Sequence, residues 1–254
     1  MSYRVARYGW LPDLPDQRDR LYVAAPMEKP GVLPVWVDLR PQCPPVYDQG
    51  QLGSCTANAI AAAIEFDRRK QRLPDFVPSR LFIYYNERAM EHTVDSDSGA
   101  QIRDGIKSVN RLGDCPETKW PYVIARFRTR PPAKCYAEAL KYRAVLYQRV
   151  VQTTAQIKSC LASGYPVVFG FTVYESFESA PVARTGQVPL PRPGETAVGG
   201  HAVVAVGYDD TRGRFIVRNS WGTRWGQKGY FTLPYAYAAD GDLASDFWTI
   251  RLVQ

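Results

Sequence analysis

One cysteine stands where the sequence favours nucleophilic chemistry. Cys55 follows a glycine-rich stretch, residues 47–54, and begins a segment with apolar residues at i, i+3, i+4 and i+7: Ala57, Ile60, Ala61 and Ile64. We expect Ser54 to cap a helix there, which places Cys55 in the first turn. Unpaired backbone N–H groups and the helix dipole at that end favour a thiolate over a thiol. The alternative is a buried, unreactive cysteine, because free cysteines are often core residues.

A thiolate nucleophile needs a base, a group that orients the base, and donors for the oxyanion. The sequence has two histidines. His92 is expected to be exposed at the end of a helix, whereas His201 follows two glycines and opens an apolar strand. Asn219 ends a later strand, close to Trp221. An Asn that accepts from one ring nitrogen of His201 would aim the other nitrogen at the sulfur, and a Trp above that bond would exclude water. The alternative for His201 is a core histidine.

These residues need an ordered frame, and the periodicity changes along the chain. Helices are predicted over residues 55–70, 79–91, 101–112, 136–142 and 154–162. The first has an expected polar face of Glu65, Asp67, Arg68 and Arg69. Strands are predicted over residues 167–173, 201–208, 214–218, 230–233 and 247–252, with a hairpin turn at 209–213 and a surface loop over 176–199. We therefore expect an α+β protein with one main domain, residues 35–254. It is helix-rich over about 50–145 and β-rich over about 146–254, with a cleft between the halves.

Residues 1–34 are predicted to form an arm. Prolines interrupt regular structure there, and charged residues crowd the middle of the segment. The arm also carries large apolar residues: Tyr3, Tyr8, Trp10, Leu11, Leu14, Leu21 and Tyr22. Because disordered tails contain few aromatic residues, we expect the arm to dock on the main domain, with a disordered tail as the alternative.

The composition fits a globular protein with a substantial core, since 45% of the 254 residues are hydrophobic and 22% are charged. There is no apolar run of 18 residues, and the first ten residues lack the apolar region of a secretory signal. We therefore expect no membrane span, and a protein that is cytoplasmic or exported by a route without a signal. The net charge of +7 permits anionic partners. The basic stretches at 68–72 and 126–134 carry no nucleic-acid motif, so they are expected to be solvated.

The five cysteines are Cys43, Cys55, Cys115, Cys135 and Cys160. An odd number leaves at least one unpaired, and the pairing of the other four stays open. No C-x-x-C motif occurs and there are two histidines, which argues against a metal site.

Three separate blocks resemble the papain family of cysteine peptidases. They are Gln49-Gly50-x-x-Gly53-Ser54-Cys55, then Gly200-His201-Ala202-Val203, then Asn219-Ser220-Trp221-Gly222-x-x-Trp225-Gly226. The order Gln, Cys, His, Asn and the step of six residues from Gln49 to Cys55 both match. The resemblance covers the chain from about residue 35 to the C-terminus.

The resemblance implies a two-subdomain fold with a helical half, a β-barrel-like half and the active-site cleft between them. It implies that Cys55 is the nucleophile, His201 the general acid and base, and Asn219 the group that orients His201. The Gln49 side-chain amide and the Cys55 backbone N–H would form the oxyanion hole. Cys55 and His201 would act as a thiolate–imidazolium pair that hydrolyses a peptide bond through a thioester. No cofactor is implied.

The family also suggests which residues bind substrate. The expected set is Gly99, Ala100, Gly200, Trp221 and Trp225, with the main chain of Gly99 pairing with an extended peptide. Three positions depart from the family. Thr56 stands where a Trp usually follows the nucleophile, Leu52 replaces a half-cystine, and Ala100 replaces a second glycine. The change at Leu52 puts the usual disulfides in doubt and fits a bacterial branch with few of them, and Ala100 narrows the expected cleft.

Several hypotheses follow. The first is a monomeric endopeptidase that acts on peptides or proteins. The second is a binding protein that keeps the cleft without turnover, although no member of the Cys55, His201 and Asn219 set is missing. The third is an acyl transferase or amide ligase that uses the same residues. A regulatory hypothesis is that residues 1–34 lie across the cleft and limit access to it.

Overall fold

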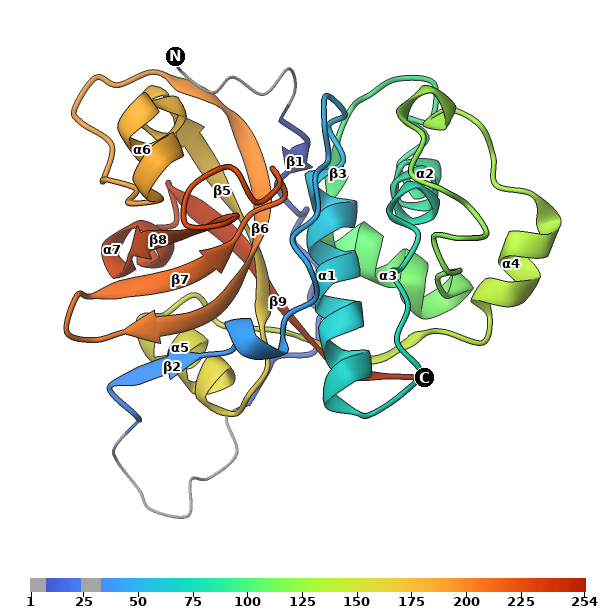
Figure 1. Ribbon diagram of the computed structural model, residues 1–254, viewed down its shortest axis with the longest axis horizontal. Coiled ribbons are helices and arrows are strands. Elements are labelled where there is room, and N and C mark those ends of the chain that lie inside the picture. Colours follow the sequence, from blue (N-terminus) through green and yellow to red (C-terminus); the bar gives the residue numbers. More distant parts are fainter. Residues whose placement is uncertain (1–7, 24–32) are drawn as a thin grey trace.

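The computed structural model describes residues 8–23 and 33–254. The predicted anchor Tyr3 lies outside these residues. A helical unit and a β-sheet lie on opposite sides of a central helix, α1 (Cys55–Lys70), as Figure 1 shows. The α+β class and the two-sided arrangement are therefore confirmed.

The helices lie close to the predicted positions. The helical half contains α2 (Arg80–Met90), α3 (Ile102–Leu112) and α4 (Ala133–Ala139), and the sheet carries α5 (Thr154–Ala162), α6 (Ala180–Thr185) and α7 (Tyr235–Ala239). Short 3-10 turns lie at Arg40–Gln42, Ile124–Arg126 and Glu175–Glu178. Helix α4 begins three residues earlier than predicted, directly after Pro132, whose fixed φ suits a helix start.

The sheet has seven strands: β2 (Trp36–Asp38), β4 (Ala144–Arg149), β5 (Val167–Tyr174), β6 (Ala197–Asp209), β7 (Arg214–Arg218), β8 (Tyr230–Pro234) and β9 (Ala244–Val253). Its order is β4-β9-β5-β6-β7-β8, and β2 pairs with β6. All of these strand pairs are antiparallel. Among the described residues β4 and β8 do not pair with each other, so the half that we expected to be barrel-like is an open, curved sheet.

The predicted polar face of α1 is wrong. Glu65, Asp67 and Arg68 are buried, because the helix is enclosed by the helical unit on one side and by the sheet on the other. Arg68 is accommodated by donating to the backbone carbonyls of Pro74 and Gln254, and Glu65 accepts from Arg69 and from the Tyr47 hydroxyl. Periodicity alone does not reveal partners that come from distant segments.

The predicted surface loop over residues 176–199 is also only partly right. It contains α6, which Ser179 caps by accepting from the backbone N–H of Val182, and it ends in the first residues of β6. Strand β4 was not predicted, because its residues do not alternate cleanly between apolar and polar. The hairpin turn between β6 and β7 is confirmed.

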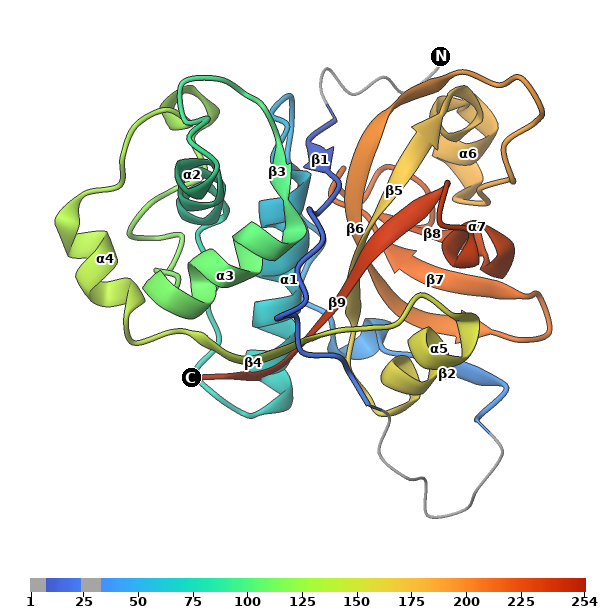
Figure 2. The ribbon, with the colours of Figure 1, turned by 180° about the vertical axis from the view of Figure 1, so that it is seen from behind.

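The described part of the arm is docked along its length. Residues 10–11 form strand β1 (Trp10–Leu11), which pairs in parallel with β3 (Ala100–Gln101). Figures 1 and 2 show β1 between β3 of the helical half and β6 of the sheet. Further along, Tyr22 is buried and donates its backbone N–H to the carbonyl of Arg149. Residues 8–23 are thus not a disordered tail.

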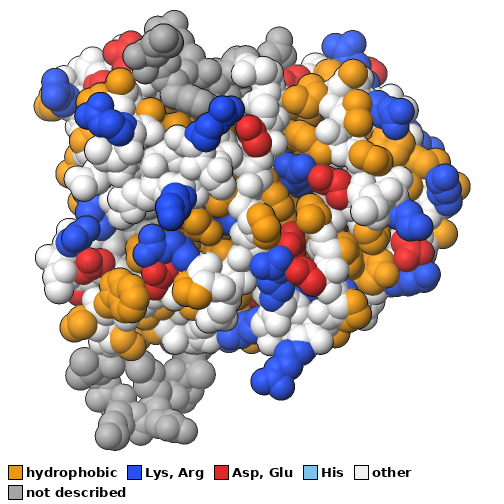
Figure 3. Space-filling model, in the orientation of Figure 1, with side chains coloured by type: hydrophobic (Ala, Val, Ile, Leu, Met, Phe, Trp, Pro, Cys, Tyr) orange, Lys and Arg blue, Asp and Glu red, His pale blue; other side chains and the backbone are white. Residues whose placement is uncertain are grey.

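The surface carries basic side chains on both halves. On the face in Figure 3, Lys and Arg are scattered rather than gathered in one patch. Across residues 8–23 and 33–254, no helix is both long and apolar enough to span a membrane.

Candidate active site

Cys55 is the first residue of α1, as predicted, and it is fully buried. Ser54 is the capping residue, but its side chain does not cap the helix. Its hydroxyl instead hydrogen-bonds with the Tyr122 hydroxyl at 2.5 Å. The backbone N–H groups of Ala202 and Gly9 face the sulfur and lower the pKa of the thiol. Burial outweighs them and raises that pKa to about 12.

His201 lies on β6 and is fixed by Asn219. Its Nε2 lies 2.8 Å from Asn219 Oδ1, and the same oxygen accepts the backbone N–H of Ser220, also at 2.8 Å. Because Asn219 Oδ1 can only accept hydrogen bonds, the hydrogen of the neutral His201 ring is on Nε2. Nδ1 of that ring is therefore an acceptor. Nδ1 is buried and has no hydrogen-bond partner among the described residues. Burial lowers the pKa of His201 to about 4, although the Asn219 bond opposes this.

Two tryptophans cover the histidine side of the site. The Trp221 ring stacks on the His201 ring with centroids 4.9 Å apart. Trp225 meets Trp221 edge to face at 5.1 Å and packs against Phe177 and Phe231. Trp221 thus shields the His201–Asn219 bond, and Trp225 supports it from behind. Both rings also line a surface hollow of about 540 Å³.

Gln49 is buried next to the start of α1. Its side-chain nitrogen donates to the Leu52 carbonyl at 3.0 Å, and its oxygen accepts from the Ser220 hydroxyl at 2.6 Å. These two bonds fix the amide so that its NH₂ group faces the loop that leads to Cys55. An amide NH₂ has two hydrogens, and Leu52 uses one of them.

Gly99 and Ala100, the two residues of the predicted substrate wall, direct their backbone N–H groups to different partners. Gly99 donates its N–H to the Tyr84 hydroxyl at 3.2 Å, within its own half of the molecule. The N–H that faces the cleft belongs to Ala100, and it donates to the carbonyl of Gly9 at 2.8 Å. The main-chain bond from this wall to the arm is therefore made by Ala100, and pairing of Gly99 with a substrate stays a prediction.

The arm reaches Cys55 at Gly9, whose backbone N–H faces the sulfur. A side chain on Gly9 would stand 1.7 Å from the Gly53 carbonyl oxygen, so only glycine allows this approach. Tyr8 lies on the side of His201, with ring centroids 6.0 Å apart, and its hydroxyl donates to Glu178 at 2.7 Å. Trp10 lies on the other side, against Gly200, and is buried. The arm therefore occupies the groove on both sides of the sulfur.

Carboxylates anchor the arm beyond Trp10. The backbone N–H of Asp13 donates to Asp246 at 2.8 Å, and the Trp248 indole donates to the Asp13 carboxylate at 2.8 Å. Burial, and next the charge of Asp246, raises the pKa of Asp13 to about 6. Asp19 forms ion pairs with Arg103 at 2.8 Å and with Arg149 at 3.2 Å. Asp246 and Glu178 could not be identified from the sequence, because isolated acidic residues carry no local signal.

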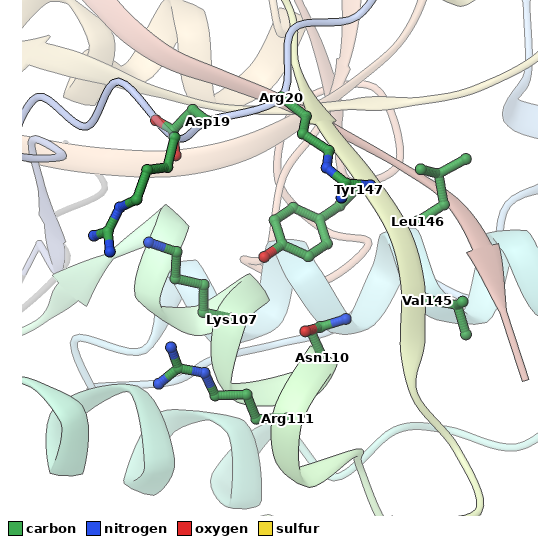
Figure 4. Close-up of a pocket in the computed structure, with 9 residues that line it drawn as sticks. Asp19, Arg20, Lys107, Asn110, Arg111, Val145, Leu146 and Tyr147 are labelled. Carbon is green, nitrogen blue, oxygen red and sulfur yellow. The ribbon is translucent and has the colours of Figure 1, made fainter.

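A second hollow, of about 390 Å³, lies where the arm crosses α3 and β4. In Figure 4, the side chains of Lys107, Arg111 and Tyr147 border it, and Arg20 approaches from the arm. The lining does not include Cys55, His201 or Asn219, so this hollow is separate from the cleft.

The departures from the family have local explanations. Thr56 donates its hydroxyl to Glu87 of α2 at 2.6 Å, and burial raises the pKa of Glu87 well above its usual value. Leu52 is buried in the core instead of forming a disulfide. All five cysteines are free thiols. In the described ranges no cluster of three or more His, Cys, Asp or Glu side chains is arranged to hold a metal ion.

Comparison with known proteins agrees with this geometry. The sequence model of the papain family of cysteine proteases matches residues 33–247. The chain belongs to this family and is therefore a cysteine protease, a hydrolase.

Two particular relatives resemble nearly the whole chain. Xylellain, a cysteine protease from Xylella fastidiosa, is 46% identical, and its crystal structure superimposes with a TM-score of 0.91 over 100% of this chain and 99% of that one. A peptidase C1-like protein of Acanthamoeba polyphaga mimivirus is 46% identical over 97% of this chain and 87% of its own length. Procathepsin L 3 of Tenebrio molitor, at 18% identity and a TM-score of 0.71, shares the fold.

Proposed function

We propose that the chain is a cysteine endopeptidase that uses Cys55, His201 and Asn219, and that the arm holds it in a closed state. The observation that carries the proposal is the 2.8 Å contact between His201 Nε2 and Asn219 Oδ1. That bond leaves Nδ1 to exchange a proton with a thiol at the start of α1. In the reaction the Cys55 thiolate attacks a peptide carbonyl, His201 protonates the leaving amine, and water then hydrolyses the thioester.

The oxyanion of the attacked carbonyl would be held by two N–H groups. One is the Cys55 backbone N–H at the start of α1, and the other is the Gln49 amide hydrogen that Leu52 does not use. The bond from Ser220 to Gln49 positions that amide before substrate arrives. Preorganised donors of this kind stabilise the transition state without reorganisation.

The charge states of the closed form support regulation by the arm. In the closed form, burial raises the pKa of Cys55 to about 12 and lowers that of His201 to about 4, so both groups are neutral at pH 7. Departure of the arm returns water to both groups and removes the desolvation that opposes the ion pair. The thiolate–imidazolium pair is thus a property of the open form.

The direction of the arm explains why it would inhibit rather than be cleaved. His201 must face the leaving amine, and Tyr8 lies beside His201. Tyr8 therefore occupies the leaving-group side, and Trp10 occupies the acyl side. A substrate has its N-terminal residues on the acyl side, so the arm runs in the opposite direction. The parallel pairing of β1 with β3 agrees, because a substrate would pair with Ala100 antiparallel.

The test is hydrolysis of denatured casein by the full chain and by its Gly9→Ala variant, each with and without Cys55→Ala. We expect Cys55→Ala to abolish cleavage in both backgrounds. Cleavage that persists undiminished in the Cys55→Ala proteins would refute the proposed nucleophile.

A further inference from the structure

The loop that leads to Cys55 is held by a carboxylate from a distant segment. The backbone N–H of Gly53 donates to both oxygens of Asp97, at 3.1 Å and 3.2 Å. Asp97 lies in the loop between α2 and β3, just before the wall residue Gly99. A Cβ on residue 53 would stand 3.0 Å from Asp97 Oδ1, so the close approach suits glycine. The contact joins the loop before the nucleophile to the segment that carries the predicted substrate wall.

The Asp97 carboxylate is itself held by helix α2. The Tyr84 hydroxyl donates to Asp97 Oδ1 and accepts the backbone N–H of Gly99 at 3.2 Å. Arg88, one turn further along α2, is buried and donates to the carbonyl of Ser96 at 2.8 Å. Its guanidinium lies over the Tyr84 ring, 4.0 Å from the ring centroid. Asp97 is therefore part of a built network whose other members are side chains of the helical core.

The peptide unit between Leu52 and Gly53 connects Asp97 to Gln49. Its N–H donates to Asp97, and its carbonyl, that of Leu52, accepts from the Gln49 side-chain nitrogen at 3.0 Å. A peptide unit is planar, so an orientation that is fixed at the N–H is also fixed at the carbonyl. A carboxylate that accepts from the N–H also polarises the unit, which strengthens its carbonyl as an acceptor. Asp97 thus orients the carbonyl that holds the Gln49 amide.

We propose that Asp97 is a positioning residue of the oxyanion hole. It acts through the Leu52–Gly53 peptide on Gln49, and so directs the amide hydrogen that Leu52 does not use. The inference rests on the proposed function, since it names the residue that aligns one of the two proposed donors. A donor must be held closely in place to act on the transition state. Removal of Asp97 should therefore lower activity through Gln49, whereas a residue that only stabilises the fold would act whether or not Gln49 is present.

The experiment is a double-mutant cycle of Asp97→Ala and Gln49→Ala in the full chain with Gly9→Ala. The measured quantity is kcat at a saturating concentration of a fluorogenic peptide, where the arm no longer competes with the substrate. We expect Asp97→Ala to lower kcat by about tenfold when Gln49 is present, which is less than the loss of the donor itself. In the Gln49→Ala protein the same change should lower kcat by less than about twofold, because the residue through which Asp97 acts is gone.

Asp95→Ala is the matched control, because Asp95 is an exposed carboxylate of the same loop. It should leave kcat unchanged in both backgrounds. Tyr84→Phe is a second variant, which tests the same link even if Asp97→Ala does not fold. It removes the hydroxyl that donates to Asp97 and keeps the buried ring. We expect it to lower kcat by at least about threefold, and only when Gln49 is present. Losses that are equal with and without Gln49, or no loss at all, would overturn the assignment.

A measurement without turnover separates this inference from the proposed function. The side-chain NH₂ of Gln49 and the backbone amide of Gly53 are followed by NMR in the full chain with Cys55→Ala. We expect Asp97→Ala to shift both NH₂ resonances and to speed hydrogen exchange at Gly53 by at least about tenfold, while Asp95→Ala changes neither. These changes without Cys55-dependent hydrolysis would refute the endopeptidase and keep the link from Asp97 to Gln49. Unchanged resonances together with Cys55-dependent hydrolysis would do the reverse.

Discussion

The backbone carbonyl of Gly9 accepts a hydrogen bond from the backbone N–H of Ala100 at 2.8 Å. This bond joins the arm to the wall where an extended substrate would pair, directly beside Cys55. In the proposed function, the arm and a substrate would therefore compete for the same donor. Access to Cys55 would then depend on how tightly the arm is held, and the first two predictions test this.

Asp19 joins the described arm to α3 and to β4 through two ion pairs. Its side chain is 6% exposed and pairs with the side chain of Arg103, which is 5% exposed, and with Arg149. Breaking a buried pair leaves an uncompensated charge, so we expect Asp19→Asn to release the arm and to raise the rate at which a thiol-alkylating epoxide labels Cys55 by at least about tenfold. Asp16→Asn is the control. Its partner Arg18 is largely solvent-exposed, and its ion pair with Lys107 of α3 is longer, at 3.3 Å, and less buried than the Asp19–Arg103 pair, so we expect a smaller effect. Equal labelling of both variants, measured by peptide mass spectrometry, would contradict the anchoring role.

Arm docking should weaken as the pH rises through about 6. Docking raises the pKa of Asp13 from its usual 3.8 to about 6, so the docked form binds this proton more tightly than the released form. Below about pH 6 the docked Asp13 is protonated, which stabilises docking. Above about pH 6 its negative charge and that of Asp246 repel each other. We expect the ratio of Cys55 labelling rates, parent over Asp13→Asn, to increase between pH 5 and pH 7.5. The ratio cancels the pH dependence of the thiol, and a ratio that is flat or falls would count against the carboxylate pair.

The oxyanion role of Gln49 gives a kinetic prediction. Gln49→Ala should lower kcat by on the order of 10²-fold, because it removes one of two donors. Ser220→Ala removes only the hydrogen bond that holds the Gln49 side-chain oxygen, so it should lower kcat clearly less. Both variants are measured in the Gly9→Ala background. If Gln49→Ala lowers kcat no more than Ser220→Ala does, the Gln49 amide does not act on the oxyanion.

The local elements of the fold could be predicted well from sequence. The segment from Cys55 to Lys70 has helical periodicity, and α1 has these bounds. The same reasoning failed for Glu65 and Arg68, whose partners Tyr47 and Gln254 come from other parts of the chain. Burial depends on what packs against a helix, and one segment's periodicity does not contain that information.

The active site shows the same difference between what local patterns predict and what depends on distant segments. The blocks around Cys55, His201 and Asn219 carry a family pattern, and the structure brings His201 and Asn219 to hydrogen-bond distance. Asp246 and Glu178 become significant only when Trp10 and Tyr8 lie against them. These contacts span 236 and 170 residues of sequence. Long-range pairs between the arm and the sheet have no spacing that a sequence pattern could reveal.

The proposed control of the cleft by the arm is tested most directly through Gly9. A methyl group at residue 9 would stand 1.7 Å from the Gly53 carbonyl oxygen, so Gly9→Ala cannot keep the observed docking. Overpacking of this kind costs about 1–3 kcal/mol, which corresponds to an increase of about 5- to 150-fold in the open fraction. Leu14→Ala is the control, since the Leu14 side chain is 68% exposed in the same arm.

The measurement is kcat/KM for a fluorogenic peptide, with Cys55 labelling followed in parallel by mass spectrometry. We predict that Gly9→Ala raises both quantities by the same factor while Leu14→Ala leaves them unchanged. A Gly9→Ala protein that is folded by circular dichroism but no faster than the parent would contradict closure of the cleft by the arm.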